Sequence, residues 1–222
     1  MKLYSYWRSS SAWRVRIVLA WKAIPYEYVA VNLAPDAAEN ASESYAAVNA
    51  LGQVPTLEWT EAGRVVRLTQ SVAIAEYLGE RFPEPHFIPK GTLERARVRQ
   101  AVEIVNSGIQ PLQNSATVAA LRALCDEDGV KTWIRNGMTR GLAALESLAL
   151  GHGGAFLVGN EPSLADACLV PQLYNARRFA VDLAPYPKLT EIEAATGSLE
   201  AFARAHPDQQ PDAPADSRVR NE

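Results

Sequence analysis

Three consecutive serines, Ser9, Ser10 and Ser11, stand between two tryptophan–arginine pairs near the start of the chain. A short strand-like run, residues 3–6, precedes them, and apolar residues at helical intervals follow, so the serines occupy a strand-to-helix turn. A helix start has unpaired N–H groups and a partial positive charge, which stabilise an anion. The turn is therefore a candidate anion or thiolate site, and the alternative is that one serine simply caps the helix.

Two further features suit the binding of a peptide-like ligand. Val54 and Pro55 begin a β-rich run, where a cis peptide bond would leave the backbone of Val54 free to pair with a ligand. An ordinary trans proline at the first residue of a strand is the alternative. Gln70 and Ser71 stand at a second helix start, which suits a carboxylate, although Ser71 also qualifies as an N-cap. Together the features suit a ligand with a thiol at one end and a carboxylate at the other.

The first part of the chain predicts a small α/β domain over residues 1–82. After the first helix come a β-rich run at 26–31 and a weak helical stretch at 37–48. Strands at 54–59 and 65–68 are predicted to form an antiparallel hairpin, and a helix follows at 71–81. The predicted order is βαβαββα with a mixed sheet.

Three prolines between Pro83 and Pro89 place a linker at residues 83–91, because they interrupt both helices and strands. Residues 92–222 then predict an all-helical second domain that ends in an extended, partly mobile tail from His206. Ser163 and Asp166 form a capping-box variant, which we interpret as a folding element. The predicted helices are residues 93–123, 130–150, 163–179, 188–195 and 198–205.

The predicted helix 93–123 contains an unusually polar run at residues 106–115. Gln110 and Asn114 are four residues apart and would share a helix face, which either is solvated or closes over a ligand held by the first domain. Pro111 would bend this helix. Two arginines, Arg177 and Arg178, stand at the end of a later helix, where cations are favoured in any case.

Composition excludes several classes of function. The net charge is −3 and the basic residues are spread along the chain, so no nucleic-acid partner is expected. No apolar run suggests a membrane span or a signal peptide, so a cytoplasmic location is expected. Cys125 and Cys168 are too few for a disulfide framework, and the three histidines lack ligand spacing, so we expect no metal site.

Taken together, these motifs resemble the zeta class of the glutathione transferases, a class that includes maleylacetoacetate isomerases. The resemblance covers nearly the whole chain and is strongest at residues 4–16, 53–57, 70–71, 108–114, 164–166, 169–172, 175–179, 185–187 and 206–212. It implies a thioredoxin-like first domain with a cis proline at Pro55, an all-helical second domain and a homodimer.

The resemblance also implies a cofactor and a set of binding residues. Glutathione would pair its cysteinyl backbone with Val54, and its γ-glutamyl carboxylate would lie at Gln70 and Ser71. Its sulfur would lie at the serine turn, and Arg8 and Arg178 would face the carboxylates of a small maleyl dicarboxylate, with Arg178 also catalytic. The full set of implied glutathione contacts is Ser9, Ser10, Ser11, Arg14, Gln53, Val54, Pro55, Gln70, Ser71, Gln110 and Asn114.

One position departs from the family pattern. The turn usually reads Ser-Ser-Cys, and here its third residue is Ser11. Thiol–disulfide exchange needs a protein thiolate, so this serine argues against reductive dehalogenation and leaves isomerisation open. The implied activity is the conversion of maleylacetoacetate to fumarylacetoacetate in tyrosine and phenylalanine breakdown. The alternatives are a maleylpyruvate isomerase, a general transferase acting on α-halo acids, and a non-catalytic glutathione-binding protein.

Overall fold

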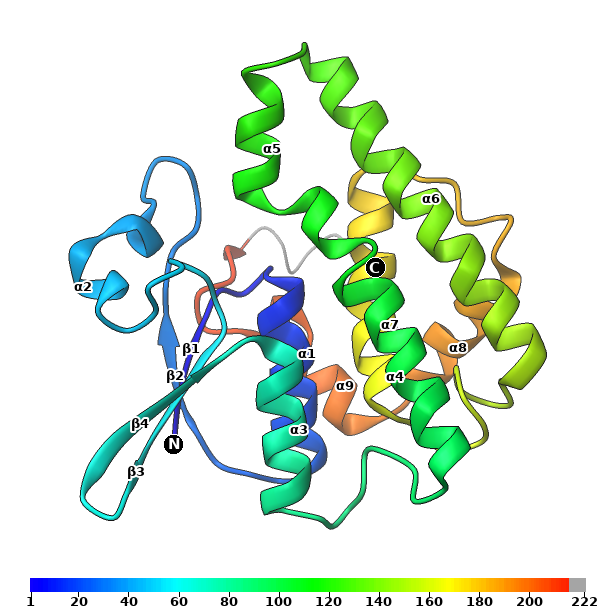
Figure 1. Cartoon of the computed structure of the whole chain (residues 1–222), viewed down its shortest axis with the longest axis horizontal. Helices are drawn as coiled ribbons and strands as arrows, with labels where there is room; N and C mark the ends of the chain where they lie inside the picture. The colour runs from blue at the N-terminus through cyan, green and yellow to red at the C-terminus, as the bar shows by residue number, and fades with distance from the viewer. Residues whose placement is uncertain (216–222) are drawn as a thin grey trace. The chain divides into compact units, whose positions relative to one another are not determined.

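A four-stranded mixed sheet forms the centre of the N-terminal part in the computed structural model, which describes residues 1–215 (Figure 1). The strands are β1 (Lys2–Ser5), β2 (Glu27–Ala30), β3 (Thr56–Glu61) and β4 (Arg64–Thr69). Their order is β2-β1-β3-β4, with β1 parallel to β2 and antiparallel to β3. The antiparallel pairing of β3 with β4 confirms the predicted hairpin, which turns at Gly63 with φ of +74°, a value that glycine adopts readily.

Two helices, α1 (Ser10–Trp21) and α3 (Ser71–Arg81), pack against each other beside this sheet. Their apolar residues Ile17, Leu19, Ile74 and Leu78 are fully buried, which explains why both helices form where the helical periodicity places them. The predicted helix 37–48 is shorter than expected. It is reduced to a 3₁₀ turn (Glu39–Ala41) and α2 (Glu43–Ala46), because Ser42 is extended and caps α2.

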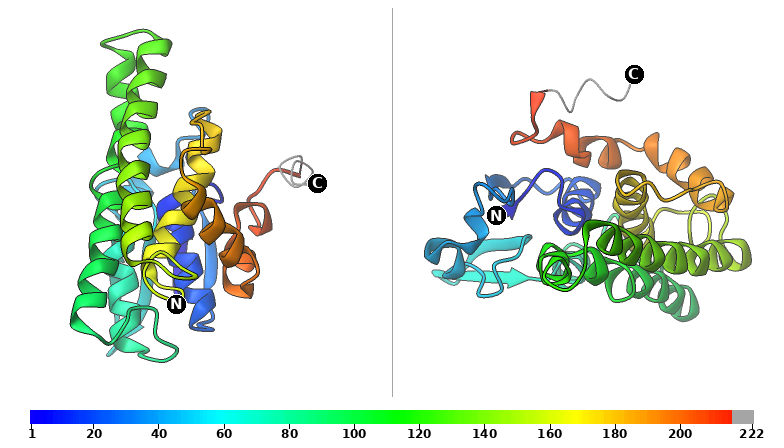
Figure 2. Two further views of the ribbon diagram at one scale, coloured as in Figure 1. Left: turned by 90° about the vertical axis from the view of Figure 1, so that its right-hand side faces the viewer. Right: turned by 90° about the horizontal axis from the view of Figure 1, so that it is seen from above.

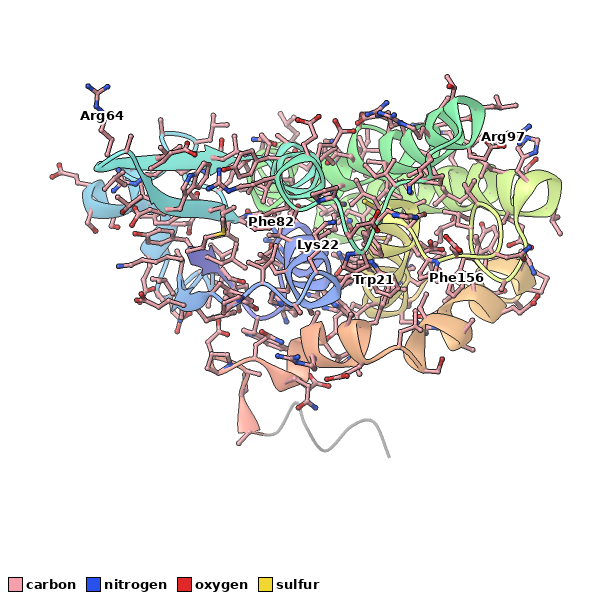
Figure 3. All side chains as sticks on the ribbon, turned by 90° about the horizontal axis from the view of Figure 1, so that it is seen from below. Trp21, Lys22, Arg64, Phe82, Arg97 and Phe156 are labelled. Atoms are coloured by element: carbon pink, nitrogen blue, oxygen red, sulfur yellow. The ribbon has the colours of Figure 1, made fainter. Side chains whose placement is uncertain are left out.

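The predicted linker begins in direct contact with the end of α1. Lys22 Nζ donates hydrogen bonds to the carbonyl oxygens of Phe82, at 2.6 Å, and Pro85, at 2.9 Å. The indole of Trp21 donates to the His86 carbonyl at 3.0 Å. Figure 3 labels Trp21, Lys22 and Phe82 at this end of the helix. Residues 82–86 are therefore fixed to the first part of the fold.

The structure separates into two compact units that differ from the predicted domains at the C-terminal end. One unit is Phe87–Ser198, and the other combines Met1–His86 with the chain from Leu199. The prediction that residues 92–222 form one domain is therefore wrong for its last part. The reason is that α9 (Glu200–Ala205) packs against α1 of the first unit (Figure 1).

The predicted extended tail is also wrong for the residues that the structure describes. A 3₁₀ turn (Pro207–Gln209) follows α9, and Pro207, Asp208 and Gln210 are buried. The Gln210 side chain donates to two backbone carbonyls of the preceding helix end. Residues 216–222, the remainder of the predicted tail, lie outside the described residues.

The second unit is helical, as predicted, but its first predicted helix is divided. Residues 93–123 form α4 (Thr92–Asn106), a 3₁₀ turn η2 (Gln110–Gln113) and α5 (Ser115–Arg122), because Pro111 supplies no N–H group and Asn114 is extended. The remaining helices are α6 (Glu127–His152), α7 (Leu164–Arg178) and α8 (Pro187–Gly197). The 26-residue α6 runs along α4 (Figure 2).

The capping box at the start of α7 is confirmed. The buried Asp166 carboxylate accepts hydrogen bonds from the backbone N–H and the hydroxyl of Ser163, and from the N–H of Leu157 at 2.8 Å. Burial raises the pKa of Asp166 to about 6, against the effect of these donors. Among the described residues, no helix has the length and apolar character needed to span a bilayer.

Candidate active site

The serine turn connects β1 to α1, and its three hydroxyls have different roles. Ser9 is the N-cap of α1, and its Oγ accepts a hydrogen bond from the N–H of Ala12 at 3.2 Å. The Ser9 hydroxyl keeps its own proton for donation. Ser10 and Ser11 are the first two helical residues, whose N–H groups have no partner within the helix. The turn therefore presents two backbone donors and three hydroxyls at the positive end of α1.

Arg14 links this turn to the second helix start. It lies one helical turn after Ser10, is only 1% exposed, and donates from Nη1 to Ser71 Oγ at 3.4 Å. Ser71 is the first residue of α3, and the prediction that it is the N-cap of this helix is wrong. Two of the predicted binding features, the serine turn and Ser71, are thus brought together by a buried cation.

The N-cap of α3 is Gln70, which adopts an unusual backbone conformation. Its φ is +69°, and its side chain makes no capping hydrogen bond. Left-handed conformations are uncommon outside glycine and concentrate at functional sites. Because no side chain caps α3, the N–H groups at its start are available to a ligand carboxylate.

The cis peptide bond that the resemblance implies at Pro55 is confirmed. The Val54–Pro55 peptide bond is cis, and β3 begins only at Thr56. Among residues 1–215, nothing forms a hydrogen bond with the backbone N–H or C=O of Val54. Val54 is nevertheless buried. Buried backbone N–H and C=O groups require hydrogen-bond partners, which a bound ligand can supply.

The residue before Val54 is held by contacts that sequence reasoning missed. The carbonyl oxygen of Gln53 accepts a hydrogen bond from the Tyr45 hydroxyl at 2.8 Å and from Asn49 Nδ2 at 2.6 Å. Tyr45 belongs to α2, and Asn49 lies in the same α2–β3 loop as Gln53, where no sequence pattern marks such contacts. These contacts fix the loop that presents the free backbone of Val54.

In the second unit, the structure contradicts the predicted common helix face of Gln110 and Asn114. Gln110 begins the 3₁₀ turn η2, whereas Asn114 is the extended N-cap of α5. The Asn114 side-chain oxygen accepts from the N–H of Ala116 at 3.1 Å. That oxygen is therefore used for capping, and Asn114 can offer a ligand only the N–H groups of its side-chain amide.

The two arginines at the end of α7 have different environments. Arg177 forms a bidentate ion pair with Glu193 of α8, so its guanidinium is used within the unit. Arg178 is exposed and donates to the side-chain oxygen of the buried Asn175 at 3.1 Å. In the first unit, Arg8 lies over the ring of Trp7, with its guanidinium carbon 5.3 Å from the ring centroid. Arg178 and Arg8 are the two arginines that the family resemblance assigns to an acidic substrate, and that role stays a prediction.

Comparison with known proteins assigns the two halves of the chain. Residues 1–80 match the model of the glutathione S-transferase N-terminal domain, and residues 92–195 match that of the glutathione S-transferase C-terminal domain. The chain belongs to the glutathione S-transferase family. This confirms the resemblance seen in the sequence motifs and the predicted fold class.

Individual glutathione S-transferase relatives are similar over almost their full lengths. A maleylacetoacetate isomerase of Dictyostelium discoideum is 44% identical over 95% of both chains. The maleylacetoacetate isomerase of Anaeromyxobacter dehalogenans, solved with glutathione in its active site, is 50% identical with a TM-score of 0.89, over 96% of this chain and 97% of that one. A second structure of that enzyme holds dicarboxyethyl glutathione and citrate in the active site.

A maleylpyruvate isomerase described as a bacterial zeta-class glutathione S-transferase is also similar. It is 40% identical with a TM-score of 0.89, and the match covers 96% of this chain and all of the other. The similarity to two kinds of isomerase shows that this member of the family is an enzyme.

Proposed function

We propose that this protein is a zeta-class, glutathione-dependent isomerase that converts maleylacetoacetate to fumarylacetoacetate in tyrosine and phenylalanine breakdown. The observation that carries the proposal is the hydrogen bond by which the buried Arg14 of α1 links the Ser9-capped start of that helix to the uncapped start of α3, in the same unit as the free backbone of Val54. The identities of 44% and 50% to maleylacetoacetate isomerases support the choice of reaction.

The residues of the first unit fit glutathione. The unused N–H and C=O of Val54 can pair with the cysteinyl backbone of a peptide, with Gln53 and Pro55 on either side. The uncapped start of α3, at Gln70 and Ser71, can bind the γ-glutamyl carboxylate. Contacts from Gln110 and Asn114 stay predictions that rest on the family resemblance.

The serine turn would hold the sulfur. A free thiol has a pKa of about 8.5, so it is mostly protonated at neutral pH. The N-terminus of α1, a hydroxyl donor from Ser9 or Ser10, and the buried Arg14 would each favour the thiolate. Ser11 stands in the place of the family cysteine, and we expect its replacement to matter less to this role than replacement of Ser9 or Ser10.

When bound, glutathione supplies a thiolate that adds reversibly to the maleyl double bond, which becomes a single bond that can rotate. The protein must then stabilise negative charge that develops on the dicarboxylate. Arginine can hold a carboxylate with two parallel hydrogen bonds. We assign this role to Arg178, whose guanidinium is oriented by Asn175, and secondarily to Arg8.

Maleylpyruvate is the second candidate substrate, because the zeta-class maleylpyruvate isomerase matches this chain with the same TM-score. The two acids share the maleyl double bond and differ in the group attached to it. Reductive dehalogenation is less well supported, because Ser11 provides no thiol for disulfide exchange.

Absorbance assays of both acids, with and without glutathione, test the proposal. We expect glutathione-dependent isomerisation, with a larger kcat/KM for maleylacetoacetate. A larger kcat/KM for maleylpyruvate would transfer the assignment to the second candidate. Equal rates with and without glutathione would refute the proposed cofactor. We also propose that the enzyme is a homodimer and that it acts in the cytoplasm. Light scattering on the purified protein would test the dimer.

A further inference from the structure

The C-terminal segment, which we define as residues 199–215, contacts the backbone of Trp7, two residues before the serine turn. Asp212 lies 205 positions after Trp7, yet its Oδ2 accepts a hydrogen bond from the N–H of Trp7 at 3.0 Å. Its other carboxylate oxygen, Oδ1, accepts from the hydroxyl of Tyr28 at 2.7 Å. Both oxygens of this carboxylate therefore bind groups of the first unit that lie beside the turn.

Arg16 holds the other side of the same residue. It is fully buried, and its Nη2 donates to the carbonyl oxygen of Trp7 at 2.8 Å. Its Nη1 donates to Tyr6 O at 3.3 Å, and its Nε donates to Ala205 O in the C-terminal segment at 3.1 Å. Burial lowers the pKa of Arg16 to about 10, and the Asp212 carboxylate opposes that shift.

The peptide groups of Trp7 are thus held by a carboxylate on the N–H side and a guanidinium on the C=O side. Hydrogen bonds to charged groups are shorter and stronger than those between neutral groups. The next contact along the chain is the hydrogen bond from the N–H of Ser9 to Tyr6 O, at 3.0 Å. A shift at residues 6 and 7 would therefore move Ser9 and the start of α1.

Attachment of the C-terminal segment alone does not require Asp212. Before it, α9 already packs on α1, Pro207 is buried, and Gln210 is buried with two hydrogen bonds to backbone carbonyls. What Asp212 adds to these contacts is its hydrogen bonds to Trp7 and Tyr28. Its carboxylate therefore contacts residues beside the serine turn and none within the C-terminal segment itself.

We propose that Asp212 is a positioning residue for the reaction, acting through the Trp7 backbone to hold the serine turn where it binds the glutathione sulfur. Asp212 touches neither glutathione nor the substrate in this role. The role rests on the proposed function, because it concerns the same sulfur. Displacement of catalytic groups by about 1 Å can reduce rates about a hundredfold, so even a small relaxation of the turn is measurable.

The test compares Asp212→Ala, Asp212→Asn and Asp208→Ala in the full-length protein. Asp208 is the matched control, because it is a buried carboxylate of the same segment and lies 3.5 Å from the His206 ring nitrogen. The readouts are the pKa of the bound glutathione thiol, from the ultraviolet absorbance of the thiolate against pH, and kcat and KM for maleylacetoacetate.

We expect Asp212→Ala to raise the thiol pKa by about one unit, which reduces the thiolate fraction at neutral pH by up to about tenfold. The kcat should fall to a similar extent, with little change in KM. Asp212→Asn keeps an acceptor for the Trp7 N–H and should restore most of both losses. Asp208→Ala should lower thermal stability while leaving the thiol pKa at its wild-type value.

A wild-type thiol pKa in Asp212→Ala, or an equal shift in Asp208→Ala, would overturn the role of Asp212 while leaving the proposed function intact. Failure of Asp212→Asn to restore either readout would overturn it as well. If Asp212→Ala does not fold, Tyr28→Phe removes only the second hydrogen bond to the carboxylate. That variant should shift the thiol pKa upward, and an unchanged value would contradict the proposal. A wild-type enzyme that does not lower the glutathione pKa would instead refute the proposed function, and this role with it.

Discussion

At the scale of single residues, the two neighbouring arginines of α7 differ in their hydrogen-bond partners. Arg177 forms an ion pair with the carboxylate of Glu193, whereas Arg178 donates a hydrogen bond to the neutral side-chain oxygen of Asn175. The sequence alone could not distinguish their environments, because both stand at a helix end that favours cations. The choice of Arg178 came from the family resemblance, and the ion pair that engages Arg177 within the unit agrees with that choice.

Replacing Arg178 with alanine should therefore reduce substrate turnover much more than glutathione binding. If the charged hydrogen bonds of Arg178 stabilise the transition state by about 2.7 kcal/mol, their loss would lower kcat/KM for maleylacetoacetate about a hundredfold. Arg177→Ala is the matched control, since it removes an ion pair within the unit and should leave kcat/KM within about threefold of wild type. Steady-state kinetics and calorimetric titration with glutathione measure the two effects. Equal losses of turnover and glutathione affinity in Arg178→Ala would remove it from the substrate role.

At the scale of elements, the polar turn η2 is placed by close packing against α6. A Cβ atom added at Gly141 would lie 2.2 Å from Cγ1 of Ile109, which is fully buried just before η2. At Gly137 it would lie 2.6 Å from Cδ1 of Leu112, within η2 itself. Two glycines of α6 thus allow the approach of the turn that carries Gln110.

Gly141→Ala should destabilise the protein by about 1–3 kcal/mol, because Ile109 has no room to move aside. Gly151→Ala is the control on the same helix, since a Cβ there meets nothing within 4 Å. It should be neutral or stabilising by up to about 1 kcal/mol, as expected from helix propensity. Urea unfolding of the three proteins provides the comparison. Equal stability of the two variants would show that the packing of η2 is looser than described.

The Asp166 carboxylate at the start of α7 gives the stability of the second unit a pH dependence. Because its pKa is raised from the ordinary value near 3.8 to about 6, the folded state binds more protons than the unfolded state between these values. The stabilising contribution of Asp166 is therefore fully present below pH 3.8 and decreases as the pH rises through about 6. Asp166→Asn, which cannot titrate, should lack this component.

Urea unfolding of the wild-type protein and Asp166→Asn at several pH values across this range would isolate the component. The free energy of unfolding of the wild-type protein, relative to that of the variant, should fall as the pH rises. A difference that rises with pH would show that the three hydrogen-bond donors outweigh burial at this carboxylate.

At the scale of the whole molecule, the sequence predicted the parts of the fold that local patterns determine. The βαβαββα order, the hairpin after Pro55 and the helical second half all follow from periodicity and turn residues. It did not predict that the chain from Leu199 joins the first unit. The contacts responsible, such as that of Asp212 with Trp7, connect residues far apart in the sequence, and a proline-rich polar segment has no periodicity that reveals them.

In the site, too, the features that depend on adjacent residues were predicted and those that depend on distant contacts were not. The serine turn and the free backbone of Val54 stand where the sequence placed them, because each depends on a few adjacent residues. Gln70 as the N-cap of α3 was missed, since a left-handed glutamine has no sequence signal and Ser71 is the better capping residue by type. The bond between Arg14 and Ser71 was missed because it joins two helices.

The central claim is that the sulfur of glutathione is bound as a thiolate where β1 gives way to α1. A crystal structure of this protein with glutathione tests it most directly. We expect the sulfur within hydrogen-bonding distance of the hydroxyl or N–H groups of residues 9–11, with the cysteinyl backbone paired to Val54. Glutathione bound with its sulfur away from this turn would show that the serine turn does not hold the thiolate.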